Sequence, residues 1–420
     1  MGSALLNLPI SNPSDNVMRT GILPAIHLTY CTNIHPSTGW EQAFNTLKHY
    51  APKLKAALSP HAPFGIGMRI SGVESIALCE GDHLDELKAW LDENGLYVFT
   101  INGFPYGPFH NQPVKENVHA PDWRDDERVA YTLRLVHILA ALLPEDVESG
   151  GISTSPLSYK RWVDLTDRAT WELMTRNVCQ VASAMYRVRQ DTGKLLHLDL
   201  EPEPDGVLEN SGEVVAFYRD WLLTYGADVL ASELKITAEA AREALLTHIQ
   251  LCFDTCHVAV AYEEPSDFLD AIAPLGIRVG KIQVSSAVQI MLPEHKGSRP
   301  AVQKALQPFI ESTYLHQVIQ RNHDGSLTQY PDLPQALEHL DDPQAAEWRI
   351  HFHVPIFVES YGVLDSTQAG ILKTFAALRN RQFTRHLEIE TYTWDVLPQG
   401  MKRDLYESIR REFEWVVQNL

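Results

Sequence analysis

The sequence predicts an α/β fold, a closed (β/α)8 TIM barrel, and three observations lead to this prediction. Short β-rich runs alternate with longer helical patterns along the 420 residues, which is typical of parallel strands covered by helices. Eight such units favour a closed barrel over an open, doubly wound sheet. No linker and no low-complexity stretch divides the chain. Residues 1–420 are therefore expected to form a single barrel domain.

The expected elements follow from local patterns. Residues 82–94 illustrate a helix: Asp82 can cap its beginning, leucines recur at helical spacing, and Asn94-Gly95 ends it. Other helical patterns cover 125–143, 162–190, 211–224 and 403–418. The expected barrel strands are the β-rich runs 26–30, 64–70, 96–102, 150–154, 195–201, 250–254, 279–284 and 386–390.

A long insertion follows the seventh expected strand. Residues 285–348 exceed an ordinary βα loop, and another β-rich run, 349–354, precedes the last barrel strand. A TIM barrel that carries such insertions can exceed roughly 400 residues. We expect 285–348 to be an excursion over the barrel mouth that encloses a site there.

The composition of the chain limits the classes of molecule that it is expected to bind. The 35 Lys+Arg and 54 Asp+Glu give a formal net charge of -19, which disfavours nucleic acid and anionic membrane surfaces. No apolar run reaches the roughly 18 residues of a membrane span, and the N-terminus lacks the pattern of a secretory signal. The five cysteines show no disulfide framework. We expect a cytoplasmic protein with a small-molecule substrate, no nucleic acid and no direct membrane insertion.

Polar residues stand where the later strands end, which is where TIM barrels place functional groups. Asp199 and Glu201 alternate with leucines in the fifth strand, so they share one face. The sixth strand ends in Asp254-Thr255-Cys256-His257, the seventh contains Lys281 and Gln283, and the last leads to Glu390. Carboxylates that converge in one mouth repel one another, and a divalent cation is the simplest compensation. Oxygen-rich ligands suit Mn²⁺ or Mg²⁺, while Zn²⁺ and Co²⁺ stay open.

Several candidate residues allow more than one interpretation. His257 is a second ligand or holds a substrate hydroxyl. Gln283 is a ligand or a hydrogen-bonding residue of the core. His353 is a ligand, a substrate contact or a core histidine, and Glu203 and His316 are further candidates for ligand or substrate contact.

The run from Asp254 to His257, with Glu201 before it and Glu390 after it, resembles the sugar-phosphate isomerase/epimerase superfamily of xylose isomerase-like TIM barrels. Members typically hold one divalent metal with Glu, Asp, His and Glu from strands five to eight. The resemblance implies that Glu201, Asp254 and Glu390 are the first, second and fourth ligands. The third position falls on Gln283, where the superfamily usually has His, and His353 is the alternative.

Longer motifs resemble a narrower family, the bacterial metabolite-traffic proteins called EboE, which are encoded with a UbiA-like membrane prenyltransferase. This resemblance implies a link to metabolite traffic and specifies no reaction. It rests on 30–35 (Tyr-Cys-Thr-Asn-Ile-His), 102–107 (Asn-Gly-Phe-Pro-Tyr-Gly), 351–355 (His-Phe-His-Val-Pro) and 390–394 (Glu-Thr-Tyr-Thr-Trp).

The leading hypothesis is a metal-dependent isomerase or epimerase that acts on a sugar- or polyol-like molecule. Glu201 and Glu390 would bind the metal and move protons, Asp254 would be a ligand, His257 would orient a substrate hydroxyl, and Lys281 would be an electrophile. One alternative is a non-catalytic metabolite carrier or scaffold for a membrane partner. A second alternative is a metal-dependent hydrolase.

Overall fold

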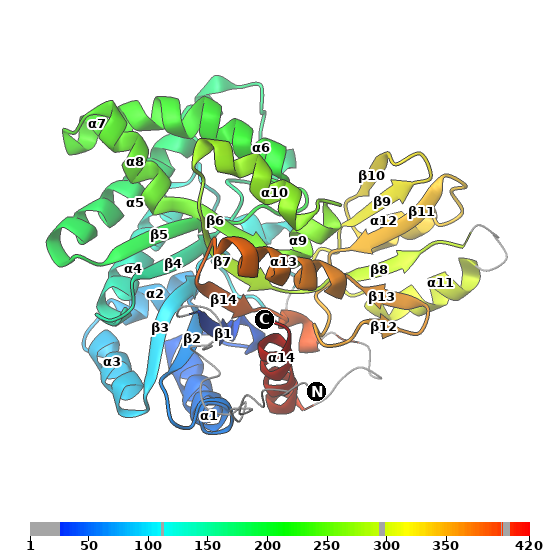
Figure 1. Ribbon diagram of the computed structural model, residues 1–420, viewed down its shortest axis with the longest axis horizontal. Helices are drawn as coiled ribbons and strands as arrows, with labels where there is room; N and C mark the ends of the chain where they lie inside the picture. Colours follow the sequence, from blue (N-terminus) through cyan, green and yellow to red (C-terminus); the bar gives the residue numbers. More distant parts are fainter. Residues whose placement is uncertain (1–25, 111–112, 294–298, 396, 398–403) are drawn as a thin grey trace, which may run out of the picture.

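The computed structural model describes residues 26–110, 113–293, 299–395, 397 and 404–420. Eight parallel strands form one sheet in the order β1-β14-β7-β6-β5-β4-β3-β2, with helices around it (Figure 1). The predicted TIM barrel is confirmed, and each strand begins and ends within one residue of its expected bounds. The strands are β1 His27–Tyr30, β2 Phe64–Arg69, β3 Leu96–Asn102, β4 Ser149–Thr154, β5 Leu195–Leu200, β6 Ile249–Asp254, β7 Val279–Val284 and β14 His386–Ile389.

The barrel closes between β1 and β2 through a short contact. The Thr29 hydroxyl donates to the Gly65 carbonyl at 2.9 Å and accepts from the Gly67 backbone N–H at 2.7 Å. A parallel bridge joins Cys31 to Gly67. Glycine is required at position 67, because a Cβ there would lie 2.8 Å from the Tyr30 carbonyl oxygen and would overlap the Glu388 side chain.

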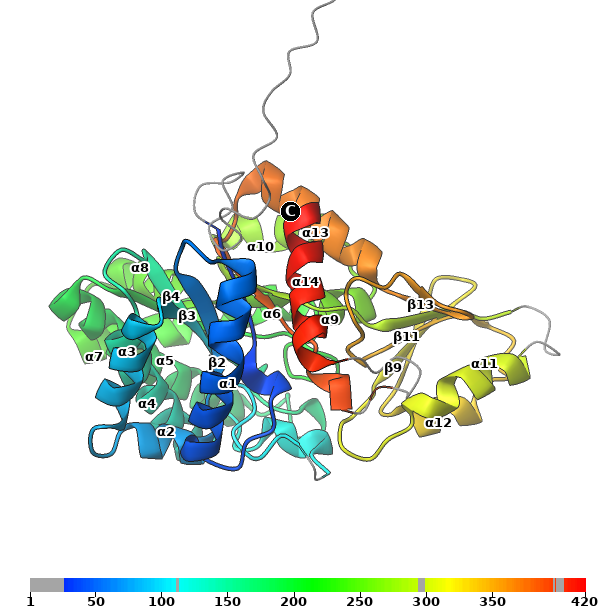
Figure 2. The same ribbon diagram turned by 90° about the horizontal axis from the view of Figure 1, so that it is seen from below.

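The barrel helices begin at side-chain caps in several places. Asp125, Asp167 and Asn210 accept backbone N–H groups at the beginnings of α4, α5 and α6. α5 therefore begins later than the pattern 162–190 suggested. The helices are α1 Trp40–Leu58, α2 Gly72–Leu78, α3 His83–Glu93, α4 Asp126–Leu142, α5 Arg168–Thr192, α6 Ser211–Phe217, α7 Ala227–Leu234, α8 Ala238–His248, α9 Thr255–Val260, α10 Pro265–Ile272, α13 Gln368–Arg381 and α14 Leu405–Asn419, which packs beside α1 (Figure 2).

The insertion after β7 builds a sheet of its own, beside the barrel (Figures 1 and 2). Its six strands are ordered β10-β9-β11-β8-β13-β12 and pair antiparallel. Strand β11 ends four residues earlier than the expected run 349–354, and residues 351–355 form a loop beside the barrel end. The elements are β8 Val288–Met291, α11 Arg299–Leu306, β9 Val318–Asn322, β10 Leu327–Tyr330, α12 Leu333–Glu338, β11 Ala345–Ile350, β12 Ser360–Tyr361 and β13 Leu364–Ser366.

The barrel interior is unusually polar. Because side chains alternate along a strand, β5 directs His197, Asp199 and Glu201 to one face, and β7 does the same with Lys281 and Gln283. All five side chains are buried. The residue closest to the carboxyl end of each strand therefore stands at the barrel mouth, with the others in layers beneath it.

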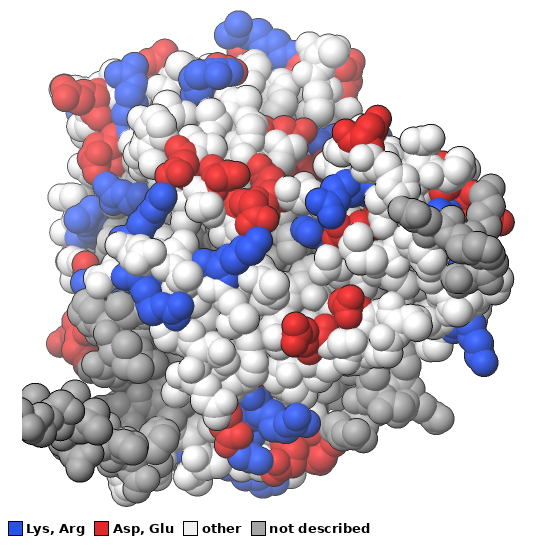
Figure 3. Space-filling view, turned by 45° about the vertical axis from the view of Figure 1, so that its right-hand side comes forward, with Lys and Arg blue, Asp and Glu red and all other residues white. Residues whose placement is uncertain are grey.

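Two expectations concern the location of the protein in the cell rather than its fold: the lack of a membrane span and the lack of a secretory signal. In the part of the chain that the structure describes, no helix has the length and apolar character needed to cross a membrane. Residues 1–25, on which the expected lack of a secretory signal rests, lie outside the described residues. On the face shown in Figure 3, acidic and basic side chains are interspersed rather than gathered by sign.

Candidate functional site

Three carboxylates converge at the carboxyl ends of the barrel strands. Glu201 follows β5, Asp254 ends β6, and Glu390 follows β14. One oxygen of each lies within 4.8 Å of the others, and all three side chains are buried. The prolines at 202 and 204 end β5 directly after its carboxylate. We call these three residues the carboxylate cluster.

Gln283 of β7 occupies the centre of the carboxylate cluster. Its Nε2 donates to Glu201 Oε1 at 2.8 Å, to Asp254 Oδ2 at 3.1 Å and to Glu390 Oε2 at 2.8 Å. Its Oε1 lies 3.3 Å from the Cys252 thiol. In this orientation the neutral amide offers its donors to the carboxylates. Half a turn about the last side-chain bond would place the carbonyl oxygen there instead, as a metal ligand requires.

Neutral amides also hold Glu390 in place. Its Oε1 accepts from Asn33 Nδ2 at 2.6 Å and from Asn102 Nδ2 at 3.0 Å. Glu201 is held less completely, because its buried Oε2 has no hydrogen-bond partner among the described residues. A buried acceptor without a partner costs free energy. This oxygen is therefore available to a ligand.

Burial and mutual repulsion control protonation in the carboxylate cluster. Burial, with the charges of Glu390 and Asp254, raises the pKa of Glu201 well above its ordinary value, and burial and Asp254 do the same for Glu390. Burial also opposes ionisation of Asp254. The nearby His257 and His353 rings and the Ser285 hydroxyl outweigh burial and lower the pKa of Asp254. The glutamates therefore retain protons that a bound cation would displace.

Four histidines surround the same mouth. His257 Nδ1 lies 3.0 Å from the Pro202 carbonyl oxygen, and its Nε2 lies 3.1 Å from His351 Nε2. His353 Nδ1 lies 2.8 Å from the Glu390 carbonyl oxygen. His316 uses both ring nitrogens, one on the His351 carbonyl oxygen and one on the Glu311 carboxylate. Both nitrogens of His316 are thus engaged in the structure.

Lys281 and Glu203 have separate partners. The buried Lys281 ammonium forms an ion pair with Glu388. Lys281 and Glu388 do not line the cavity described below. Burial opposes the charge, but the Glu388 carboxylate raises the pKa of Lys281. Glu203 Oε1 lies 2.9 Å from His119 Nε2. Lys281 is therefore placed beneath the carboxylate cluster, while Glu203 faces the mouth.

A cavity opens beside the carboxylate cluster, and side chains of both the barrel and the insertion line it. Polar and aromatic side chains both line it, so a bound molecule would contact both kinds of group. Tyr314, Leu315 and Gln317 bring the insertion to its wall. Other lining residues are Phe104, Phe109, His119, Glu201, Glu203, His257, His351, His353, Glu390 and Tyr392.

The structure gathers most of the residues singled out from the sequence, namely Glu201, Glu203, Asp254, His257, Gln283, His353 and Glu390. It also adds residues that the sequence reasoning missed. Asn33 and Asn102 follow barrel strands, so the strand-end rule could have found them. His351 lies two residues before His353, a spacing that was visible. Ser285 directly follows β7, so the strand-end rule also indicates it, whereas nothing local marks His119 or Gln317.

The described residues fit a divalent cation. Three carboxylates supply hard oxygen ligands, Glu201 Oε2 is unpartnered, and the amides around them carry no compensating charge. The cluster lies next to the cavity, so an ion there would be within reach of a bound molecule.

No protein-family model matches this sequence. No curated protein matches it either. Solved structures resemble it at low identity. A xylose isomerase-like TIM barrel protein from Mycobacterium smegmatis in complex with magnesium covers 93% of this chain and 95% of its own, with a TM-score of 0.49 and 11% identity. A D-allulose 3-epimerase from Methylomonas sp. in complex with D-allulose covers 94% and 97%, with a TM-score of 0.46 and 11% identity. The probable 3-DHS dehydratase AsbF from Bacillus anthracis covers 93% and 98%, with a TM-score of 0.44 and 10% identity.

Proposed function

We propose that this protein is a metal-dependent isomerase or epimerase that acts on a sugar- or polyol-like small molecule. The observation that carries the proposal is the carboxylate cluster, which is buried, shares the neutral Gln283 amide as a donor to all three carboxylates, and borders a cavity. A divalent ion, when bound, would polarise a substrate carbonyl and compensate negative charge that develops beside it.

The chain's own carboxylates would move the proton. Isomerisation and epimerisation remove a proton from one carbon and return one to a neighbouring carbon or to the opposite face. Glu201 and Glu390 both accept from Gln283 Nε2 at 2.8 Å, and as unprotonated metal ligands one or both would also take up and return the substrate proton. Asp254 stays ionised as a ligand. The aromatic wall of the cavity would exclude water from the carbanion-like state.

We further propose a link to metabolite traffic, with a UbiA-like membrane prenyltransferase as the functional partner and the cytoplasm as the location. The sequence motifs at 30–35, 102–107, 351–355 and 390–394 support this link. All four motifs supply residues to the site: Asn33, Asn102, His353 and Glu390. The excursion 285–348 is proposed to cover the site as a whole.

A metabolite carrier without catalysis is the second candidate, and one observation favours it. The Gln283 amide donates to all three carboxylates of the cluster, so the protein supplies a shared donor to them in place of a cation, while Glu201 Oε2 keeps no partner among the described residues. A carrier would use the same cavity and need no proton transfer.

Metal binding and proton exchange separate the two candidates. We expect close to one divalent ion per chain in the carboxylate cluster, measured by calorimetric titration with Mn²⁺. Glu390→Gln should reduce occupancy strongly, whereas Glu412→Gln, a buried glutamate outside the site, should not. Gln283→His should retain or strengthen metal binding, because imidazole is the better ligand in most sites of this type. Full occupancy in both Glu390→Gln and Asp254→Asn would refute the site.

Exchange in D₂O then tests catalysis. With a panel of ketoses and polyols, the wild type should transfer solvent deuterium to a substrate carbon, and Glu201→Gln should abolish the transfer. Two results would favour the carrier: the wild type binds no divalent metal, and Gln283→His impairs ligand binding without a gain in metal affinity.

A further inference from the structure

A second group of possible metal ligands lies at the junction of the barrel and the insertion. His257 lies in the first turn of α9 of the barrel, whereas His351 and His353 lie on the loop after β11. Each ring places Nδ1 against an oxygen: the Pro202 carbonyl, the Gln317 side chain and the Glu390 carbonyl, respectively. This is the arrangement that metal-binding histidines commonly show, because it fixes the ring and leaves Nε2 free.

The oxygens determine which ring nitrogen carries hydrogen. A backbone carbonyl only accepts, so the Nδ1 atoms of His257 and His353 must be the donors. Gln317 is oriented by its own Nε2, which donates to the Pro204 carbonyl at 3.1 Å, and its Oε1 therefore faces His351 Nδ1 at 2.9 Å. His351 must donate there as well. In their neutral forms all three rings present an Nε2 lone pair.

Two of these lone pairs face each other. His257 Nε2 and His351 Nε2 are 3.1 Å apart, a separation at which the lone pairs of two neutral rings repel unless a proton or a metal ion lies between them. A metal ion at about 2.0–2.1 Å from both nitrogens would subtend an angle of about 100°, close to tetrahedral. Both rings are buried, so bulk water does not relieve the repulsion.

Glu203 completes a set of three ligands. Its Oε2 lies 4.0 Å from His257 Nε2, and ligand atoms of Glu203, His257 and His351 lie within 4.8 Å of one another. His119 Nε2 contacts the other oxygen at 2.9 Å and so orients the carboxylate. All three residues line the cavity, which provides an entry path and an open coordination position.

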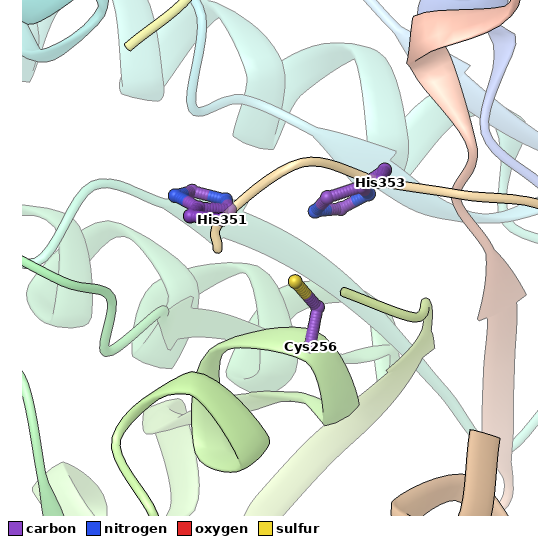
Figure 4. Close-up of side chains that lie close together, drawn as sticks. All are labelled: Cys256, His351 and His353. Carbon is purple, nitrogen blue, oxygen red and sulfur yellow. The ribbon is translucent and has the colours of Figure 1, made fainter. Parts of the chain in front are cut away.

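A neighbouring set is less suitable. Cys256, His351 and His353 also come within metal-binding reach, and Figure 4 shows the Cys256 sulfur directed from α9 toward the two rings. Cys256, however, is fully buried and does not line the cavity. Burial raises the pKa of its thiol well above the ordinary value, which disfavours the thiolate that a metal needs.

We propose that His257, His351 and Glu203 bind a second divalent ion of the Zn²⁺ class, next to the carboxylate cluster, whose Asp254 Oδ2 lies 3.8 Å from His257 Nε2. Two imidazoles and one carboxylate suit Zn²⁺, whereas the all-oxygen carboxylate cluster suits Mg²⁺ or Mn²⁺. The ion would join the insertion to the barrel, because His351 comes from one and His257 and Glu203 from the other. This inference goes beyond the proposed function and does not depend on metal in the carboxylate cluster.

The test measures Zn²⁺ affinity of the full chain by competition with a chromophoric chelator, in the presence of excess Mg²⁺. We expect His351→Gln and Glu203→Gln each to weaken Zn²⁺ binding by about 100-fold or more. The matched controls are His248→Gln, which removes a buried ring that also has a free Nε2, and Cys256→Ser. Both should retain wild-type affinity, as should Glu390→Gln. Circular dichroism confirms that each compared variant is folded, and Glu203→Gln serves if His351→Gln fails to fold.

Cobalt(II) provides a second readout, because a tetrahedral site with nitrogen ligands absorbs visible light far more strongly than an octahedral oxygen site. The wild type loaded with Co²⁺ should show the strong bands, and Glu203→Gln should lose them. Wild-type Zn²⁺ affinity in Glu203→Gln, or loss in Cys256→Ser, would overturn the assigned ligands. Loss of the same single ion in both Glu390→Gln and Glu203→Gln would show one shared site and overturn the proposal.

Discussion

Two layers of buried charge lie inside the barrel, and they are compensated differently. In the lower layer Lys281 forms an ion pair with Glu388, and His197 Nδ1 contacts Asp199 Oδ1 at 2.7 Å. In the upper layer the carboxylate cluster has one neutral amide, Gln283, as its shared donor. The lower layer contains a buried positive partner, Lys281, although Asp199 Oδ2 and Glu388 Oε1 have no hydrogen-bond partner among the described residues. The upper layer has no such partner within it. A cation bound there would therefore lower the electrostatic free energy of the folded protein more than a cation in the lower layer.

The largest effect should come from breaking the lower layer. Lys281→Met leaves Glu388 buried without its partner, and we expect a loss of about 3–5 kcal/mol in the free energy of unfolding. The matched control is Lys373→Met, because Lys373 pairs with Glu264 on the surface, where both side chains are more than half exposed. That pair should contribute less than about 1 kcal/mol. Equal losses in the two variants, measured by urea unfolding, would contradict the assignment of a structural role to the lower layer.

A solitary buried carboxylate sharpens the comparison. Glu412 of α14 is buried, and burial raises its pKa from 4.5 to about 8, although hydrogen bonds from Thr391 and the Ile356 N–H oppose the rise. Between these values the folded state holds a proton that the unfolded state releases. Stability should therefore fall as pH rises from about 5 to 8, by up to about 1.4 kcal/mol per pH unit.

Urea unfolding of wild type and Glu412→Gln at several pH values measures this contribution. The variant should show a shallower decline over the same range, and below pH 4.5 the difference in slope should vanish. Identical slopes between pH 5 and 8 would show that Glu412 ionises as readily in the folded protein as in the unfolded chain.

The smallest effect should come from the upper layer itself. Gln283→Leu removes the shared donor, and we expect a loss of about 1–3 kcal/mol in chelator. Added Mn²⁺ should recover much of that loss, because the three carboxylates remain as ligands and binding stabilises the folded state. The matched control, Gln320→Leu, removes a buried amide of the insertion that bonds Trp348 and Asp342. Recovery of both variants by Mn²⁺, or of neither, would speak against a cation in the carboxylate cluster.

The sequence predicted the barrel closely because its strands are short β-rich runs between strong helical patterns. The strand-end rule also placed Glu201, Asp254, Gln283 and Glu390 together, since parallel strands bring their carboxyl ends to one edge. The amide orientation of Gln283 has no local signal, because it depends on where three distant carboxylates lie.

The insertion was predicted less well. Its strands are held by antiparallel partners within the insertion, and only the Asp324-Gly325 turn marks the β9–β10 hairpin locally. The contact between His257 and His351 joins residues 94 positions apart. Such a contact depends on how the insertion packs against the barrel, which no periodicity in the sequence records.

A crystal structure of the protein soaked in Mn²⁺, with anomalous differences measured, tests the central claim most directly. The account predicts one strong anomalous peak bounded by Glu201, Asp254 and Glu390, with the Gln283 carbonyl oxygen turned toward it. An upper layer without a peak, in which Gln283 Nε2 still donates to the three carboxylates, would contradict it.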